Sequence, residues 1–144
     1  FRQVDPLFAF DLSTPKEPTL EGELKIPGFS NYMHPLGETY LLTVGLAGDD
    51  GGLGGERQVQ LFDESDLKNP EQVDTMVPSK LKGGRAYSEA GWDHHAFTYD
   101  PESRILVTPI QGYWKSWDSQ FSGFSVIEVG TELNSLAERG WIEH

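Results

Sequence analysis

The residues best suited to chemistry form the stretch Asp93-His94-His95, with Glu89 four positions before Asp93. Imidazole nitrogens and carboxylate oxygens bind divalent metals such as zinc, and both groups serve as general acids or bases. In an extended strand, however, neighbouring side chains point to opposite sides. Only one histidine is then expected to face a given site. The alternative is that both histidines only make hydrogen bonds at the entrance to a strand.

A second candidate metal site is the glycine-rich segment 48–56, which carries Asp49, Asp50 and Glu56. Closely spaced carboxylates on a permissive backbone can surround a hard cation such as calcium. The spacing matches neither the EF-hand loop nor the nine-residue calcium repeat, so a solvated loop without an ion is the alternative. A nucleotide site is disfavoured, because the segment lacks lysine and the Gly-x-Gly-x-x-Gly pattern between a strand and a helix.

A third candidate is an aromatic segment, residues 112–121, which contains Tyr113, Trp114, Trp117 and Phe121. If exposed, these rings offer a stacking surface for a sugar or an anchor for a protein partner. If turned inward, they only fill space between sheets. Nucleophilic catalysis has no support, since the chain has no cysteine and no Gly-x-Ser-x-Gly motif.

Short strands must position these candidates. Residues 92–109 predict a β-hairpin, with alternating side chains up to Tyr99, a turn over 100–103 and a second strand from Ile105. Residues 7–11 and 19–26 predict an earlier hairpin, separated by a turn that contains Pro15 and Pro18. In its second strand, the side chains expected to point inward are Leu20, Gly22, Leu24 and Ile26.

The chain contains an internal repeat. The pattern Asp-x-Ser-x-x-x-x-Pro at Asp11 to Pro18 returns 52 residues later at Asp63 to Pro70. A degenerate third copy covers 124–129, where Glu128 replaces the aspartate 65 residues after Asp63. No proline turn follows, and a short helical turn is expected over 133–139. Between the copies, residues 30–34 and 40–45 predict a second pair of strands similar to the hairpin at 92–109.

Four short antiparallel strands at a period near 50 residues are typical of a β-propeller blade. We therefore predict an all-β fold in which residues 1–144 form a single β-propeller fragment of about two and a half blades. The expected units are a half blade at 4–27, a blade at 28–79 and a blade at 87–144. Such rings need about four to eight blades. The incomplete propeller would leave open blade edges, through which it could self-associate.

The long connections of this arrangement are 46–56, 79–92 and 111–121, and all are expected at one end of the blades. Binding residues concentrate on loops that a rigid scaffold holds. The long-loop face, with Glu89 and the stretch Asp93-His94-His95, is therefore the predicted functional face.

Composition excludes several classes of partner. The chain has a net charge of −12 and only 11 basic residues, so it lacks the Lys/Arg surface that nucleic acids and anionic membranes require. No apolar run approaches the roughly 18 residues that cross a membrane as a helix. The absence of cysteine excludes disulfides and thiolate metal sites.

Four segments, 11–18, 26–37, 87–90 and 93–97, resemble large secreted prokaryotic proteins with a C-terminal propeller distantly related to WD-type repeats. The resemblance runs from about Val4 to Val129 and is most specific at His34-Pro35-Leu36-Gly37 and at 93–97. It implies an extracytoplasmic propeller, secreted or periplasmic, and it carries no established catalytic residues.

The sequence therefore favours a non-catalytic, extracytoplasmic β-propeller segment that binds a protein or a glycan through its long-loop face. Calcium is the candidate cofactor of this scaffold. The alternative function is a metal-assisted hydrolase with its site at Asp93, His94 and His95. The candidate partner-binding residues are Glu89, Tyr113, Trp114 and Trp117, and the candidate metal ligands are Asp49, Asp50, Glu56, Asp93, His94 and His95.

Overall fold

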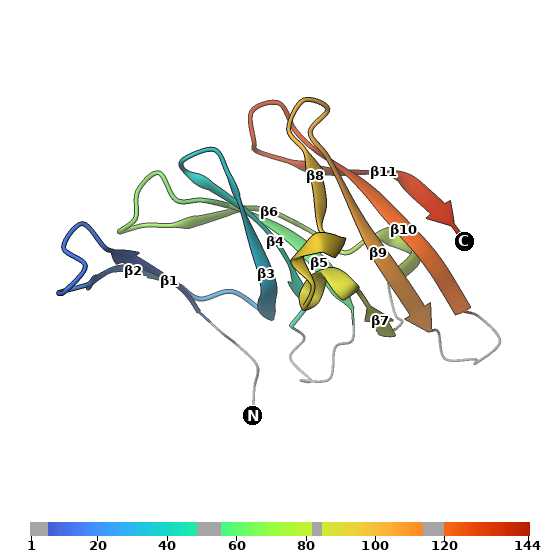
Figure 1. The fold of residues 1–144 in the computed structure, drawn as a ribbon, viewed down its shortest axis with the longest axis horizontal. Coiled ribbons are helices and arrows are strands. Elements are labelled where there is room, and N and C mark those ends of the chain that lie inside the picture. The colour runs from blue at the N-terminus through green and yellow to red at the C-terminus, as the bar shows by residue number, and fades with distance from the viewer. Residues whose placement is uncertain (1–5, 49–55, 82–84, 114–119) are drawn as a thin grey trace.

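The structure, a computed structural model, describes residues 6–48, 56–81, 85–113 and 120–144, and arranges them in three antiparallel sheets (Figure 1). The first sheet pairs β1 (Leu7–Asp11) with β2 (Thr19–Leu24). The middle sheet has the order β3 (Phe29–Leu36), β4 (Tyr40–Leu46), β5 (Arg57–Asp63) and β6 (Glu71–Met76). The last sheet has the order β11 (Leu136–Glu143), β10 (Gln120–Val129) and β9 (Ile105–Tyr113), and then β7 (Arg85–Tyr87) and β8 (Thr98–Asp100) on the same side of β9.

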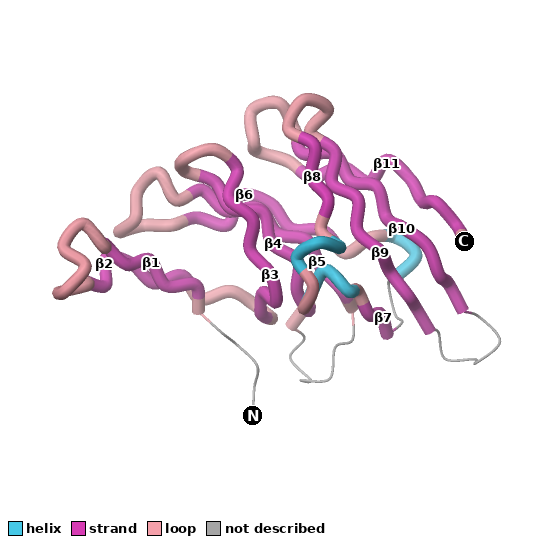
Figure 2. Tube along the Cα trace, viewed as in Figure 1, coloured by secondary structure: helices cyan, strands magenta, loops and turns pink. Residues whose placement is uncertain are grey.

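The helical segments of the described residues are three short 3₁₀ turns: η1 (Ser79–Leu81), η2 (Glu89–Gly91) and η3 (His94–Ala96). All three lie between β6 and β8 in the chain, and strands make up most of the rest of the structure (Figure 2). None of the helices in the described part of the chain is long and apolar enough to span a membrane. The predicted all-β fold is confirmed.

Burial on two faces explains the apolar sequence of the middle strands. Leu61 and Phe62 are adjacent in β5 and therefore point to opposite faces, yet both are 0% exposed. Leu61 packs in a core shared with Leu106 and Ile127 of the last sheet. Phe62 packs in a second core with Leu7 of the first sheet. The middle sheet is thus covered on both sides, as consecutive blades of a propeller are.

A β-bulge recurs at the same place in each sheet. Register shifts fall between Ala9 and Phe10, between Leu61 and Phe62, and between Val126 and Ile127. These sites are separated by the same 52 and 65 residues that relate the sequence copies. Bulges increase the local twist of a strand pair, so each repeat carries the same local distortion as well as the same strands.

The bulge also corrects one expectation. Because Phe10 pairs with Leu20 while Ala9 pairs with Gly22, Glu21 is the extra residue of β2. The residues of β2 before Glu21 therefore point to the face opposite to the one that strict alternation predicts. Leu20 shares the exposed face of Phe10 and is itself exposed, so the prediction that it points inward is wrong.

The repeated Asp-x-Ser motif closes a turn in the same way twice. The backbone N–H of Ser13 donates to Asp11 Oδ1 at 2.7 Å, and that of Ser65 donates to Asp63 Oδ1 at 2.8 Å. These hydrogen bonds lower the pKa of both carboxyl groups. In the third copy, Glu128 instead pairs with Arg139.

The short helical turn predicted over 133–139 is wrong, because Leu136 begins β11. Its backbone N–H donates to Asp74 Oδ2 of the middle sheet at 2.7 Å, and β11 pairs with β10 along its length. Contacts with residues distant in sequence thus decide the conformation of this segment.

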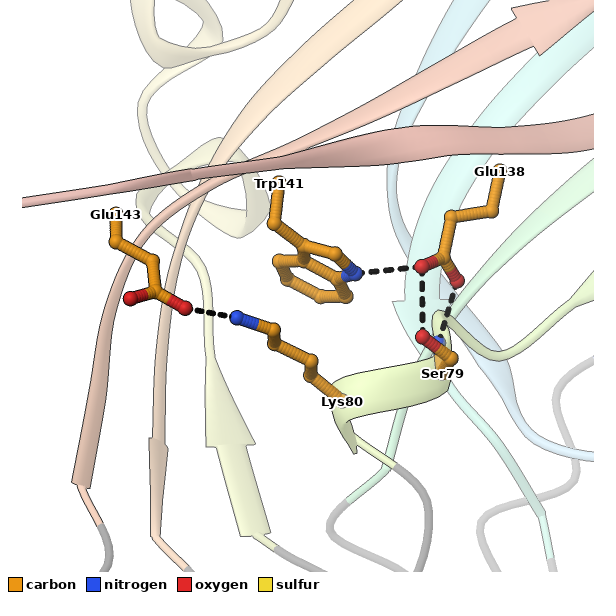
Figure 3. Close-up of polar contacts among 5 residues, drawn as sticks. All are labelled: Ser79, Lys80, Glu138, Trp141 and Glu143. Carbon is orange, nitrogen blue, oxygen red and sulfur yellow. Dashed lines mark hydrogen bonds and ion pairs between the residues drawn. The ribbon is translucent and has the colours of Figure 1, made fainter.

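A polar clasp fastens η1 to β11 (Figure 3). The N–H and the hydroxyl of Ser79 both donate to the carboxylate of Glu138 at 2.6 Å, and Trp141 Nε1 donates to the same group. Lys80 pairs with Glu143 and lies 4.7 Å from the ring centre of Phe121. The clasp therefore holds the chain leaving the middle sheet against the last sheet.

The repeat allows a matched test of two-sided burial. Phe62→Ala should lower the free energy of unfolding by about 3–5 kcal/mol, because it leaves a cavity between two sheets. Phe10→Ala changes the equivalent residue of the first sheet, which is 53% exposed, and should cost less than about 1 kcal/mol. Urea unfolding measures both values. Equal losses would contradict the packing described above.

Candidate functional site

The edge of the last sheet that carries the candidate residues is interrupted. β7 pairs with β9 at Gln111–Tyr113, and β8 pairs with β9 at Ile105–Val107. The turns η2 and η3 lie between these two short strands, whereas β3 runs unbroken along the matching edge of the middle sheet. The candidate residues therefore lie beside the middle of β9, and not at the loop-bearing end of the sheet as expected.

The first strand of the hairpin predicted over 92–109 begins only at Thr98, because His94–Ala96 form η3. The carboxylate of Asp93 accepts the backbone N–H of His95 at 2.9 Å and caps η3. Backbone bonds from Ala96 to Asp93 and from Phe97 to His94 complete the turn. An aspartate that captures a nearby backbone N–H in this way favours a turn over a strand.

This turn brings together three of the six residues predicted as metal ligands. Asp93, His94 and His95 each offer one ligand atom, and these atoms lie within 4.8 Å of one another. The imidazole rings have centres 3.9 Å apart, and His95 Nδ1 lies 3.0 Å from Asp93 Oδ1. The expectation that only one histidine faces a given site is therefore wrong, because it assumed an extended backbone.

The electrostatics of this trio (Asp93, His94 and His95) favour an ionised carboxylate. The backbone N–H of His95 lowers the pKa of Asp93 most, followed by the hydrogen bond with the ring of His95 and the charges of both histidines. All three side chains are exposed. The carboxylate is thus charged at neutral pH and accessible to a cation from solvent.

Buried residues on either side anchor the trio. Ala90 in η2 is fully buried in the core shared by the middle and last sheets. On the other side, Phe97 packs on Tyr32 and His34 of β3, with ring centres 4.9 and 5.0 Å apart. Burial lowers the pKa of His34, which favours its neutral form. The exposed trio is therefore held between two fixed points.

A buried arginine ties the beginning of this segment to the middle sheet. Arg57 Nη1 donates to Asn31 Oδ1 at 2.8 Å, and Arg57 Nε donates to the carbonyl of Ala86 in β7 at 3.1 Å. Burial lowers the pKa of Arg57. Charge-assisted hydrogen bonds of this kind are stronger than neutral ones, so β7 and the adjoining η2 are fixed against β5.

A groove of about 220 Å³ lies next to η2 on the outer face of the last sheet. The outer face is the one turned away from the middle sheet and carries Phe124. Its aromatic walls come from Tyr87, Trp92 and Phe124, and Trp92 is 68% exposed. Glu89 and His144 add polar groups to the lining. Of these residues only Glu89 was predicted from the sequence as a binding residue. The sequence carries no local signal for the others, because the exposure of Trp92 and Phe124 depends on which sheets pack beside them.

Several predicted site residues cannot be placed in this groove. Asp49, Asp50, Trp114 and Trp117 lie outside the described residues, as does the side chain of Tyr113. Glu56 is half-buried just before β5, and its carbonyl accepts the N–H of Ala47 at 2.9 Å. The calcium site and the aromatic platform therefore stay predictions.

The cap at Asp93 gives a pH-dependent test. A lowered pKa in the folded state adds stability at pH values above the unfolded pKa, and this contribution is lost as the pH falls through the folded pKa. In His95→Ala, the pKa of the carboxyl group should stay below its ordinary value, since the backbone N–H, the largest cause of the lowering, is kept. His95→Pro removes that N–H and should return the pKa toward its ordinary value. Carbon-detected NMR titration measures the pKa of Asp93 in both variants. A pKa that returns fully to its ordinary value in His95→Ala would contradict the role of the cap.

The family described as "Beta propeller domain" has a sequence model that matches residues 1–144. An uncharacterized protein of Methanocaldococcus jannaschii is 41% identical over 113 residues, which cover 78% of this chain and 17% of that protein. An uncharacterized protein of Archaeoglobus fulgidus is 39% identical over 109 residues, covering 76% and 16%. No solved structure matches the chain.

The matched region thus makes up about a sixth of each of these two relatives, whose names state no activity. The family match extends over every strand described above, and the repeated sheets agree with it. The chain therefore belongs to the beta-propeller domain family.

Proposed function

We propose that this chain is a non-catalytic scaffold that binds a protein partner on the outer face of its last sheet. The observation that carries the proposal is the aromatic groove formed by Tyr87, Trp92 and Phe124. Large exposed aromatic residues that line a hollow are typical anchors for a partner. Membership of a propeller family supports an interaction scaffold at a coarse level.

The surroundings of the groove favour a protein over a glycan. Phe124 lies opposite Pro109 on one neighbouring strand and opposite Ile142 on the other, so aliphatic surface continues on both sides of the aromatic ring. Glu89 and His144 supply polar groups at the same place. An apolar centre with a polar rim is the usual composition of a protein interface. A sugar stacked on Trp92 is the alternative ligand.

An extracytoplasmic location is part of the proposal. Its support is the resemblance of the segments 26–37 and 93–97 to secreted prokaryotic propeller proteins.

A selection experiment separates the two ligand classes. Phage that display random dodecapeptides should be enriched on the wild-type chain and lost on Phe124→Lys, which places a charge in the groove. Leu12→Lys is the matched control, because it changes an exposed apolar residue in the turn of the first sheet.

Tryptophan fluorescence during titration with cellohexaose, chitohexaose and maltohexaose provides the other arm. We expect no change with these sugars. A saturable change that Trp92→Ala abolishes would replace the protein partner by a glycan. Failure of both peptides and sugars to bind would overturn the scaffold at this groove.

The convergence of Asp93, His94 and His95 favours a second candidate function, metal-assisted hydrolysis. Zinc with three protein ligands keeps a fourth position for water, which it activates as a nucleophile. The trio does not line the groove, which is why we prefer the scaffold. The alternative role of these side chains is structural, since Asp93 already caps η3.

Calorimetric titration with zinc tests the second candidate. We expect binding of one ion per chain that is lost in His94→Ala and His95→Ala and retained in His144→Ala, a histidine outside the trio. Zinc-dependent hydrolysis of 4-nitrophenyl acetate with the same pattern would support the enzyme. The absence of zinc binding would exclude both the site and the hydrolase.

The same titration with calcium examines the glycine-rich segment, which we propose holds this ion. Binding should be lost in the double variant Asp49→Asn/Asp50→Asn and unaffected by His94→Ala. A wild-type chain that releases no heat with calcium would end this proposal.

A further inference from the structure

We propose that Phe121, Trp141 and Glu143 form a binding site for the ammonium group of a lysine that belongs to a partner protein. In the structure, Lys80 of this chain fills the site as its internal occupant. We call these three residues the ammonium cage. The inference goes beyond the proposed function, because the residues that line the groove are different ones.

The two rings of the ammonium cage meet nearly at a right angle. The ring centres of Phe121 and Trp141 are 4.9 Å apart, and the ring planes make an angle of 83°. The Nζ atom of Lys80 lies 4.7 Å from the ring centre of Phe121 and 5.7 Å from that of Trp141. Aromatic faces attract a cation within about 6 Å of the ring centre, so both rings interact with the ammonium group.

A carboxylate completes the site. Lys80 extends from η1 past the ring of Trp141 and pairs with Glu143 (Figure 3). A carboxylate accepts a hydrogen bond from a primary ammonium group, whereas a quaternary ammonium group has no N–H to donate. The chemistry of the ammonium cage therefore fits a lysine side chain better than a choline-like ligand.

The first wall of the ammonium cage is fixed by the core. Phe121 is only 7% exposed and packs with Ala86 and Ile110 of the last sheet, and Trp141 packs against the same cluster. These contacts are made within the sheet and do not involve Lys80. The position of the Phe121 ring is therefore set before any ammonium group binds.

The second wall is held by hydrogen bonds. Trp141 Nε1 donates to Glu138 at 2.5 Å, and the N–H and the hydroxyl of Ser79 donate to the same carboxylate at 2.6 Å. This set of bonds fastens η1 to β11 through Ser79 without help from Lys80. The side chain of Lys80 can therefore leave while both walls keep their places.

The ammonium cage lies on the face of the last sheet that is turned toward the middle sheet. Phe121 and Ile127 are six positions apart in β10 and share one face, and Ile127 packs in the core shared with the middle sheet. In β11, Trp141 pairs with Ser125 and Glu143 pairs with Gly123, which belong to the same face of β10. The site is thus separate from the outer face that carries the groove.

Lys80 is held weakly enough to be exchanged. The side chain of Glu143 is 69% exposed and that of Lys80 is 36% exposed, and ion pairs or cation–π contacts at such sites contribute little. The chain has a net charge of −12, which attracts basic partners. A partner that is docked by other contacts presents its lysine at a high effective concentration, so this lysine can replace Lys80.

Removal of the internal occupant tests the site. Lys80→Ala should bind n-butylammonium, which reproduces the lysine side chain, and the indole N–H signal of Trp141 should shift in NMR spectra during the titration. The wild-type chain should bind this ion at least about tenfold more weakly, because the tethered Lys80 competes with it. Lys68→Ala, which changes an exposed lysine in another turn, is the matched control and should behave like the wild type.

Further probes define the chemistry of the ligand. 1-Butanol, which has no charge, and tetramethylammonium, which has no N–H, should leave the Trp141 signal of Lys80→Ala unshifted at the same concentration. Adding Glu143→Gln to Lys80→Ala should weaken the binding of n-butylammonium. A blocked tripeptide with a central lysine should bind, and the same peptide with norleucine should not.

Several outcomes would overturn the proposal. A Lys80→Ala chain that is folded by circular dichroism and binds no n-butylammonium does so. Equal binding of 1-butanol would reduce the cage to an apolar hollow, and tighter binding of tetramethylammonium would exclude lysine as the occupant. Binding that is unchanged by Glu143→Gln would remove the carboxylate from the site. Lys80→Ser repeats the measurements if Lys80→Ala does not fold.

The ammonium cage and the groove are tested separately. Binding of n-butylammonium without selection of dodecapeptides would retain the cage and reject the scaffold at the groove. Selection of dodecapeptides without binding of n-butylammonium would retain the groove and reject the cage.

Discussion

Face-to-face packing of sheets is the constraint on which the rest of this structure depends. A four-stranded sheet with apolar side chains on both faces is stable only when each face is covered. Leu61 and Phe62 meet this requirement in opposite directions, each with a different neighbouring sheet. The loops, the groove and the trio of ligand residues are all positioned by this stack. Some apolar side chains, such as Phe10 of the first sheet and Phe124 of the last, remain exposed.

The fold was largely predictable because its main signals are local or periodic. The spacing of Asp11 and Asp63 revealed the repeat, and each aspartate indeed closes its turn through a nearby backbone N–H. The errors arose where distant residues or a bulge decide the outcome. Leu20 changes face because of the extra residue Glu21, and Leu136 joins a strand that Asp74 of another sheet helps to start.

The candidate site was less predictable. Alternation at Phe97 and Tyr99 was continued back to Asp93, although the carboxylate of Asp93 favours a turn. The trio of ligand residues was therefore named from the sequence, while its convergence was not. The groove was missed because exposure of Trp92 and Phe124 depends on which sheets are present beside them. Nothing local in the sequence distinguishes Phe124 from a residue of a covered face.

The break in the edge of the last sheet has a consequence for how such proteins diversify. Residues 88–97 replace the middle of an edge strand with two short turns, yet β9, β10 and β11 keep a continuous ladder. The edge strand of such a sheet is thus a place where the sequence can change while the remaining strands keep the architecture. A lineage can acquire new chemistry there by altering about ten residues, and a protein engineer can graft a binding loop at the same position.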